Sequence, residues 1–300
     1  MKKNKKKQLV EAILLFIVAI LTLYFNEHDK KPVADDIKNR QVDTADESNL
    51  KVYFIDVGQA DAALIFQNNE YMLIDAGNNE DGPKLVSYFK SLGITKFKIV
   101  IATHAHEDHI GGMDDIINNF TIENFYMPDK ITTTKTFEDV LDALEKNKVT
   151  FKTPTVNDKL SFQDSAIDIL SINSNADNLN DTSIVLKLKY KTTSFLFMGD
   201  ASSSVEKNIL DKDIRSDVLK VGHHGSRYST SLSFLEKVSP NYAIISSGKN
   251  NSYNHPHSET LDRLNKENVT IYRTDELGTI IAESNGTIIT FTNTKTDTNG

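Results

Sequence analysis

The chain contains no cysteine, and only 13 glycines and 6 prolines occur among its 300 residues. The lack of cysteine excludes disulfide scaffolds, cysteine-based zinc fingers, iron–sulfur clusters and thiol nucleophiles. The low glycine and proline content excludes a collagen-like or low-complexity chain. A chain of this length with 39% hydrophobic residues can bury a large core, so we expect a globular protein. Any metal site must then use histidine, aspartate or glutamate.

Acidic residues outnumber basic ones outside the first seven residues, which contain five lysines. Without these lysines and Glu11, 29 basic and 41 acidic side chains remain, a formal charge of −12. Non-specific binding to nucleic acids normally needs a cationic surface. Any role with nucleic acids must therefore come from a local groove or from metal ions.

The one long apolar run, residues 9–25, reads LVEAILLFIVAILTLYF and has a single charge. Its length is at the lower limit for a helix that spans a bilayer, and the lysines before it would keep the N-terminus in the cytoplasm. The alternative is a cleaved signal peptide and a secreted protein, but bulky residues at 23–25 disfavour cleavage. We expect a cytoplasmic basic tail (1–8), a membrane anchor helix (9–25) and an extracellular remainder, which makes a single-pass cell-membrane protein.

After the apolar run the sequence predicts three parts. Residues 26–49 mix charges of both signs and have few large apolar side chains, so we expect a flexible stalk. Residues 50–293 form the folded domain, and residues 294–300 form a polar tail.

Strand and helix patterns alternate through the folded domain. Strand-like runs such as KVYFIDV, YMLID, SIVLKLKY and TSFLFMG are rich in β-branched and aromatic residues, and helical patterns occur at 83–92, 113–120, 136–146, 231–238 and 258–265. The second half repeats the order of the first. These patterns predict two sheets with helices on their outer faces, a four-layer α/β sandwich whose site lies where strand ends converge.

The segment THAHEDHIGG (103–112) follows an apolar strand and holds four candidate metal ligands within six residues. His104 and His106 alternate along extended backbone, so both imidazoles can point the same way. Asp108 and His109 fall where the next helix begins and can turn toward a neighbouring position. The spacing therefore suits two metal ions, one for each pair.

This HxHxDH pattern resembles the metallo-β-lactamase superfamily. Five further segments narrow the resemblance: FIDVGQAD (54–61), FMGDA (197–201), VGHHGSRYST (221–230), SSGKNNSYNHPH (246–257) and YRTDELGTI (272–280). Together they are similar to the extracytoplasmic hydrolase domain of the ComEC competence proteins and its free-standing relatives, over residues 51–292. With one apolar run, we do not expect the multi-helix channel of a full ComEC protein.

The resemblance implies a metallo-β-lactamase-like αββα fold with two metals. It implies that His104 and His106 bind one ion, Asp108 and His109 bind the other, and Asp200 bridges both. Asp200 follows the apolar strand at 194–198, which would carry a carboxylate to the sheet edge.

Two adjacent histidines follow another strand end. Their side chains should diverge, so we expect one ligand, His223, and one catalytic group, His224, which faces the substrate as an acid or a phosphate contact beside Ser226. The two roles could be exchanged.

Other positions depart from the family pattern. No histidine lies between His109 and His223, so the first metal lacks the family's usual third histidine, and Asp181 is the expected substitute. The oxygen-rich site would accept Mn²⁺ as well as Zn²⁺. His255, and less readily His257, are further candidates for a ligand or a substrate contact.

Three more aspartates are expected to support the ligands rather than bind metal. Asp75 corresponds to the family's structural aspartate, which braces the histidine loop. Asp56 and Asp61 lie in the segment FIDVGQAD, the first of those that carry the resemblance.

The predicted reaction is hydrolysis, in which two metals lower the pKa of a water that Asp108 orients. The leading hypothesis is a membrane-anchored phosphodiesterase or nuclease that acts on DNA. Alternatives are hydrolysis of a cell-surface phosphocholine diester, of a β-lactam or of a lactone. A non-hydrolytic metal-binding surface protein remains a different class. No protein partner is inferred.

Overall fold

The computed structural model describes residues 48–295. The predicted basic tail and anchor, nearly all of the predicted stalk and the end of the polar tail lie outside these residues. Within residues 48–295, no helix has both the length and the apolar character needed to cross a membrane.

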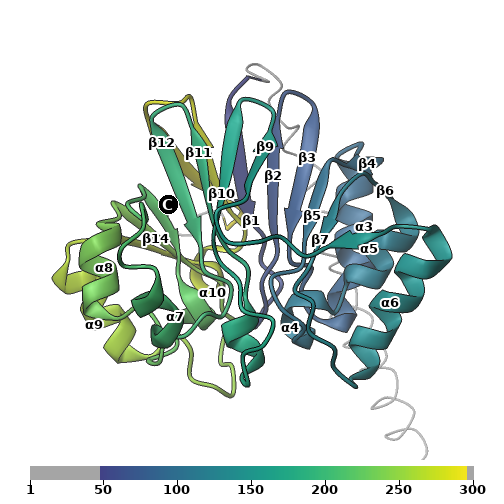
Figure 1. The fold of residues 1–300 in the computed structure, drawn as a ribbon. Helices are drawn as coiled ribbons and strands as arrows, with labels where there is room; N and C mark the ends of the chain where they lie inside the picture. Colours follow the sequence, from purple (N-terminus) through teal and green to yellow (C-terminus); the bar gives the residue numbers. More distant parts are fainter. Residues whose placement is uncertain (1–47, 296–300) are drawn as a thin grey trace, which may run out of the picture. The chain divides into compact units, whose positions relative to one another are not determined.

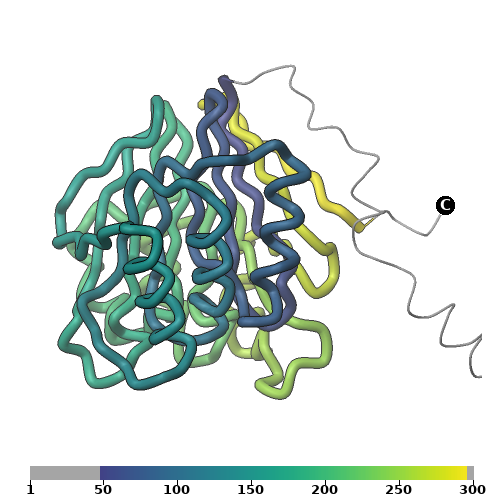
Figure 2. The backbone as a smooth tube through the Cα atoms, turned by 90° about the vertical axis from the view of Figure 1, so that its right-hand side faces the viewer, coloured from purple at the N-terminus to yellow at the C-terminus, as the bar shows by residue number. Residues whose placement is uncertain are grey.

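The first sheet has eight strands and joins the two ends of the domain. Its order is β17 (Ile289–Asn293), β16 (Ile280–Ser284), β1 (Leu50–Phe54), β2 (Ala63–Gln67), β3 (Glu70–Ile74), β5 (Ile99–Ile101), β7 (Phe125–Tyr126) and β8 (Phe151–Lys152). The strands from β17 to β3 are antiparallel, and those from β3 to β8 are parallel. Strand β16, near the C-terminus, therefore pairs with β1, as the adjacent yellow and purple segments of Figure 2 show.

The second sheet has seven strands from the middle and later parts of the chain. Its order is β15 (Thr270–Arg273), β14 (Tyr242–Ile245), β13 (Val218–Lys220), β12 (Thr193–Phe197), β11 (Val185–Tyr190), β10 (Ser165–Ser171) and β9 (Lys159–Phe162). The strands from β12 to β15 are parallel, and the others are antiparallel. A small parallel pair, β4 (Lys96–Phe97) and β6 (Thr121–Ile122), forms a separate two-stranded sheet.

Helices cover the outer face of each sheet (Figure 1). The helices α3 (Gly82–Ser91), α5 (Met113–Asn119) and α6 (Lys135–Asn147) pack on the first sheet, and α7 (Ser203–Asn208), α8 (Leu232–Val238) and α9 (Ser258–Lys266) pack on the second. Shorter helices lie in the connections: α4 (Glu107–Ile110), α10 (Thr274–Leu277), η2 (Asn79–Asp81), η3 (Leu179–Thr182) and η4 (Gly222–Gly225). The predicted four-layer αββα sandwich is confirmed.

Three apolar cores hold the layers together, one between the sheets and one under each helical layer. Strand β1 shows how one strand serves two of them. Val52 and Phe54 face the second sheet, where the Phe54 ring stacks on Phe197 with centroids 6.0 Å apart, whereas Tyr53 and Ile55 face the helices. Because both faces of the sheet are covered, a central strand such as β5 (IVI) is continuously apolar and buried rather than alternating.

The parallel strands set the position of the candidate site. The carboxyl ends of neighbouring parallel strands meet at the same edge of a sheet. The histidine loop follows β5, Asp200 follows β12, and the adjacent histidines follow β13. Ligand candidates from both sheets are thus delivered to one edge of the sandwich.

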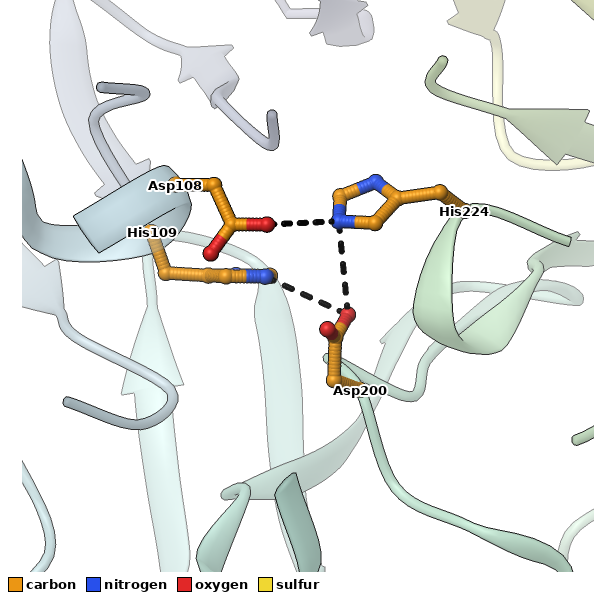
Figure 3. A group of neighbouring side chains, drawn as sticks. All are labelled: Asp108, His109, Asp200 and His224. Carbon is orange, nitrogen blue, oxygen red and sulfur yellow. Dashed lines mark hydrogen bonds and ion pairs between the residues drawn. The ribbon is translucent and has the colours of Figure 1, made fainter. Parts of the chain in front are cut away.

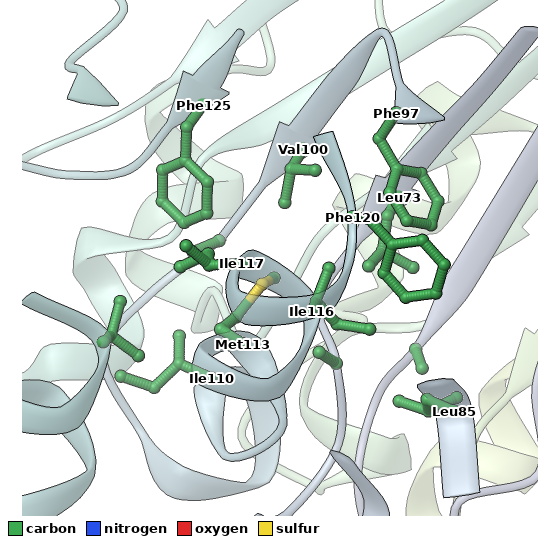
Figure 4. Close-up of a cluster of buried hydrophobic side chains, with 14 of the residues drawn as sticks. Leu73, Leu85, Phe97, Val100, Ile110, Met113, Ile116, Ile117, Phe120 and Phe125 are labelled. Carbon is green, nitrogen blue, oxygen red and sulfur yellow. The ribbon is translucent and has the colours of Figure 1, made fainter. Parts of the chain in front are cut away.

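Phe97 is a direct test of the core between the first sheet and its helices (Figure 4). Its ring is fully buried and makes edge-to-face contacts with Phe89 and Phe120, at centroid distances of 5.5 and 5.2 Å. We expect Phe97→Ala to lower the free energy of unfolding by about 3–5 kcal/mol, because it leaves a cavity and removes both ring contacts. Denaturant unfolding measures the change.

Ile288→Ala is the control at a side chain that is 61% exposed, and a change of about 0.5 kcal/mol or less is expected there. Equal effects in the two variants would contradict the packing described here.

Candidate metal centre

Strand ends and one short helix position the candidate ligands. His104 and His106 lie in the loop after β5, and Asp108 and His109 lie on α4, which begins directly after His106. Asp200 follows β12 after a tight turn at Gly199, whose φ is +52°. A Cβ at Gly199 would lie 2.9 Å from the hydroxyl of Ser183, so only glycine fits this approach.

Four side chains converge on one point (Figure 3). Ligand atoms of Asp108, His109, Asp200 and His224 all lie within 4.8 Å of one another. His109 Nε2 lies 3.2 Å from Asp200 Oδ1, and His224 Nε2 lies 3.2 Å from Asp108 Oδ2 and 3.7 Å from Asp200 Oδ1. Two imidazoles and two carboxylates are a donor set that suits a divalent transition metal.

A second group lies on the other side of Asp200. His104, His106 and Asp200 also have ligand atoms within 4.8 Å of one another. His104 Nε2 is 3.0 Å from His106 Nδ1 and 3.9 Å from Asp200 Oδ2. Asp200 thus belongs to both groups and directs a different oxygen toward each of them.

Hydrogen bonds behind the ligands fix which ring nitrogen faces the centre. Asp75 accepts bonds from the backbone N–H and hydroxyl of Thr103 and from Nδ1 of His109, each at 2.8 Å. Nδ1 of His224 donates to the carbonyl of Ser246 at 3.0 Å. Both histidines therefore present Nε2 to Asp200, as metal-binding histidines held by an outer partner do.

Unsatisfied polar atoms show that the centre fits a cation. Among residues 48–295, His109 Nε2 and Asp200 Oδ1 are buried and have no hydrogen-bond partner. Such atoms are rare in folded proteins because their desolvation is not compensated. A metal ion bound between them would satisfy both atoms.

The electrostatics of the four-residue group also favour a cation. Burial lowers the pKa of His224, but the carboxylates of Asp200 and Asp61 outweigh it and raise that pKa to about 10. Burial raises the pKa of Asp200, yet His109 and His224 outweigh it and hold that pKa well below its usual value. The carboxylates thus favour positive charge at this point, which a divalent cation supplies.

The HHGS segment departs from the expected geometry. His223 and His224 both have left-handed backbone, with φ of +53° at each. Their side chains therefore do not diverge as they would on extended backbone, and the prediction that they must is wrong. Nε2 of His223 lies 3.7 Å from Asp200 Oδ2, while Nε2 of His224 lies 3.7 Å from Oδ1.

The placement favours the exchanged roles for these two histidines. His224 is 1% exposed and belongs to the four-residue group, whereas the side chain of His223 is 28% exposed and belongs to no such group within residues 48–295. Burial lowers the pKa of His223, so its imidazole is neutral at pH 7. The amide of Asn180 lies 3.4 Å from its Nδ1 and donates to it, which leaves the proton on Nε2. We therefore expect His224 to be the ligand, and His223 to be the hydrogen-bond donor to a substrate.

Two of the expected aspartates lie elsewhere. Asp181 is on η3, and its carboxylate accepts a hydrogen bond from the backbone N–H of Ser202 at 3.1 Å, at the start of α7. Asp56 is exposed, and its carboxylate accepts from Gly58 N–H at 3.2 Å within a turn. Neither belongs to a metal-ligand group among the described residues, so the structure does not place Asp181 as the substitute ligand, and the bond that Asp56 makes lies within its own turn.

Ser226 and His257, two further candidates, make hydrogen bonds to the loop at 226–228. The hydroxyl of Ser226 accepts from the N–H of Tyr228 at 3.4 Å, and Nδ1 of His257 accepts from the N–H of Arg227 at 3.2 Å. Both bonds fix the loop that follows the adjacent histidines.

Asp61 does lie behind the centre, together with a residue that the sequence reasoning missed. Asp61 Oδ2 pairs with the buried ammonium of Lys220 at 2.8 Å, and Oδ1 lies 3.4 Å from Nδ1 of His224. Lys220 occupies the apolar strand β13, and a lysine inside such a strand was the available signal. Lys220 thus fixes the Asp61 carboxylate, which lies against the outer side of the His224 ring.

His255 lies beside the centre without joining either group. Its ring is 5.5 Å from that of His223 and 6.2 Å from that of His224. Its Nδ1 lies 3.3 Å from the side-chain amide of Gln59, another residue that the sequence reasoning missed. Burial and the two neighbouring histidines lower the pKa of His255 to about 4, so it is neutral at pH 7.

Comparison with known proteins shows which family the chain matches. Residues 55–249 match the sequence profile of the Metallo-beta-lactamase superfamily. The chain is 31% identical over 254 residues to ComE operon protein 3 of Bacillus subtilis, which covers 78% of this chain and 33% of that protein. It is 31% identical over 220 residues to Recombination protein 2 of Haemophilus influenzae, covering 71% and 26%. The chain thus spans a third or less of the length of these relatives.

A solved structure shows the same fold. The metallo-beta-lactamase fold protein YhfI from Bacillus subtilis matches 78% of this chain and 100% of its own, with a TM-score of 0.56 and 12% sequence identity. At that identity the match shows the fold alone.

The two adjacent histidines allow a sharp test of the site. We expect His224→Ala to lose metal, because it removes one of the four converging donors. His223→Ala should keep the metal and lower kcat by roughly 10²- to 10⁴-fold, as for a missing proton donor. Elemental analysis of the purified variants and their turnover numbers give both readouts. Metal loss in His223→Ala with full metal in His224→Ala would restore the opposite assignment.

Proposed function

The chain belongs to the metallo-beta-lactamase superfamily, and from this premise we propose that it is a metal-dependent phosphodiesterase that cleaves DNA. The observation that carries the proposal is the position of Asp200, whose two oxygens face two separate groups of imidazole and carboxylate donors. A carboxylate shared in this way suits two adjacent cations. When bound, such a pair activates water and neutralises the charge that develops on a phosphodiester.

The chain's own residues fill the remaining roles. Asp108 is held ionised, since His109 and His224 more than offset its burial and lower its pKa. Its carboxylate is 29% exposed, so it can orient a water and accept a proton. His223 is neutral and partly exposed, and its Nε2 lies 3.7 Å from Asp200 Oδ2. We assign it the role of donor to a phosphoryl oxygen or to the leaving group.

The names of the relatives support a nucleic-acid substrate. One is named ComE operon protein 3 and another Recombination protein 2. A third, 26% identical over 242 residues, is Competence protein ComA of Neisseria gonorrhoeae. The formal charge of −8 on the whole chain does not favour DNA. Attraction of phosphate must then come from the metal centre itself.

Membrane attachment stays a prediction, because residues 9–25 lie outside the described structure. The proposal for the reaction does not depend on it.

A substrate panel tests the proposal. The purified full-length chain, stripped of metal and reloaded with Zn²⁺ or Mn²⁺, is incubated with single-stranded DNA, bis-p-nitrophenyl phosphate, a choline phosphodiester and a chromogenic β-lactam. We expect both the DNA and the nitrophenyl diester to be cleaved, and chelator to abolish cleavage.

Asp108→Asn is the matched control, because it keeps the side-chain shape and removes the proton acceptor. Turnover of the β-lactam or the choline diester without cleavage of DNA would overturn the nuclease assignment. Metal binding without turnover of any substrate would favour the non-hydrolytic alternative.

A further inference from the structure

Three aromatic rings form a column that runs from the metal centre to the surface. The ring of His255 stacks on that of His224, with ring centroids 6.2 Å apart and an interplanar angle of 28°. The ring of Tyr253 stacks in turn on that of His255, with centroids 5.7 Å apart and an angle of 21°. Exposure rises along the column from 1% at His224 to 9% at His255 and 63% at Tyr253. A large aromatic side chain is thus exposed to solvent two ring steps from a candidate metal ligand.

The loop that carries Tyr253 is held in place by one side chain. The amide of Asn251 donates to the carbonyls of Gly248 and His255 at 2.8 and 2.5 Å. Its oxygen accepts from the N–H groups of Tyr253 and His255 at 3.1 and 2.9 Å. Four bonds from one residue fix the backbone on both sides of the tyrosine.

A second side chain ties this loop to the opposite sheet. Gln59, in the connection after β1, accepts from the N–H of Gly248 at 3.0 Å and contacts His255 Nδ1 at 3.3 Å. The Tyr253 ring is therefore presented in a fixed position, so a ligand that stacks on it need not order the loop.

We propose that Tyr253 is a base-stacking platform that makes single-stranded nucleic acid the substrate of this centre. This inference rests on the proposed phosphodiesterase function and names its substrate class. An exposed aromatic ring stacks with any nucleobase, whatever the sequence. In a duplex both faces of each base are already covered by neighbouring pairs, so only an unpaired strand can offer a base to the ring while its phosphate reaches the centre.

The charge of the protein favours this mode of recognition. The acidic surface gives little attraction to the phosphates of a long strand. Stacking is uncharged and does not depend on a cationic groove. An aromatic face also attracts quaternary ammonium groups, so a choline diester is the ligand that competes with a nucleobase for this ring.

The test compares Tyr253→Ala, Tyr253→Phe and Tyr253→Trp in the full-length, metal-loaded chain. Each is assayed on a short oligothymidylate and on an abasic strand of equal length, which keeps the phosphates and lacks the bases. We expect Tyr253→Ala to lower kcat/KM for the base-bearing strand about 5- to 150-fold relative to the abasic strand. The Phe and Trp variants should retain the preference, since stacking needs the ring and not the hydroxyl.

Tyr228→Ala is the matched control. Tyr228 is 69% exposed and makes no ring contact among the described residues. Its replacement should leave the ratio between the two strands unchanged.

Binding is measured separately by fluorescence anisotropy of the labelled strands with His223→Ala protein, which is expected to keep its metal and turn over slowly, with and without Tyr253→Ala. Weaker binding of oligothymidylate alone supports the platform even if cleavage is absent, whereas absent cleavage alone counts against the phosphodiesterase. Equal losses on both strands, or no loss, overturn the platform. A Tyr253-dependent preference for the choline diester over oligothymidylate would also overturn it.

Discussion

A carboxylate that is 2% exposed needs positive charge or hydrogen-bond donors around it, and Asp200 is the residue on which this centre depends. Histidines face both of its oxygens: His109 and His224 at one, and His104 and His223 at the other. Removing any neighbour leaves a buried charge less compensated. The ligands, their outer partners and the preference for a cation all follow from that constraint.

The fold supplies this constraint through parallel strands in both sheets. Strand β5 of the first sheet and strands β12 and β13 of the second end at the same edge of the sandwich. The apolar core between the sheets fixes the distance between these ends. Outer contacts then set the ring orientation, from Asp75 on one side and from Ser246 and Asp61 on the other. The candidate ligands thus lie at the edge of the sandwich, while apolar residues that stabilise the fold lie between the sheets.

Local patterns in the sequence were enough for the four layers, for most helices and strands, and for the histidine loop, because these depend on periodicity and spacing. The pairing of β16 with β1 joins Ser284 to Leu50 and has no local signal. The roles of His223 and His224 depend on a left-handed backbone that residue type does not predict. Asp181 has the right chemistry for a ligand, but it is engaged by the N–H of Ser202. What could not be predicted is where side chains point once distant segments meet.

Metal content in two aspartate variants tests the central claim most directly. Elemental analysis should find two metals per chain in the wild-type protein after reloading. Asp200→Ala should lose metal from both groups, because each group uses one of its oxygens. Asp181→Ala, which removes a carboxylate that only supports the loop, should keep both metals. Two metals retained by Asp200→Ala, or metal lost from Asp181→Ala with Asp200→Ala unaffected, would contradict the account.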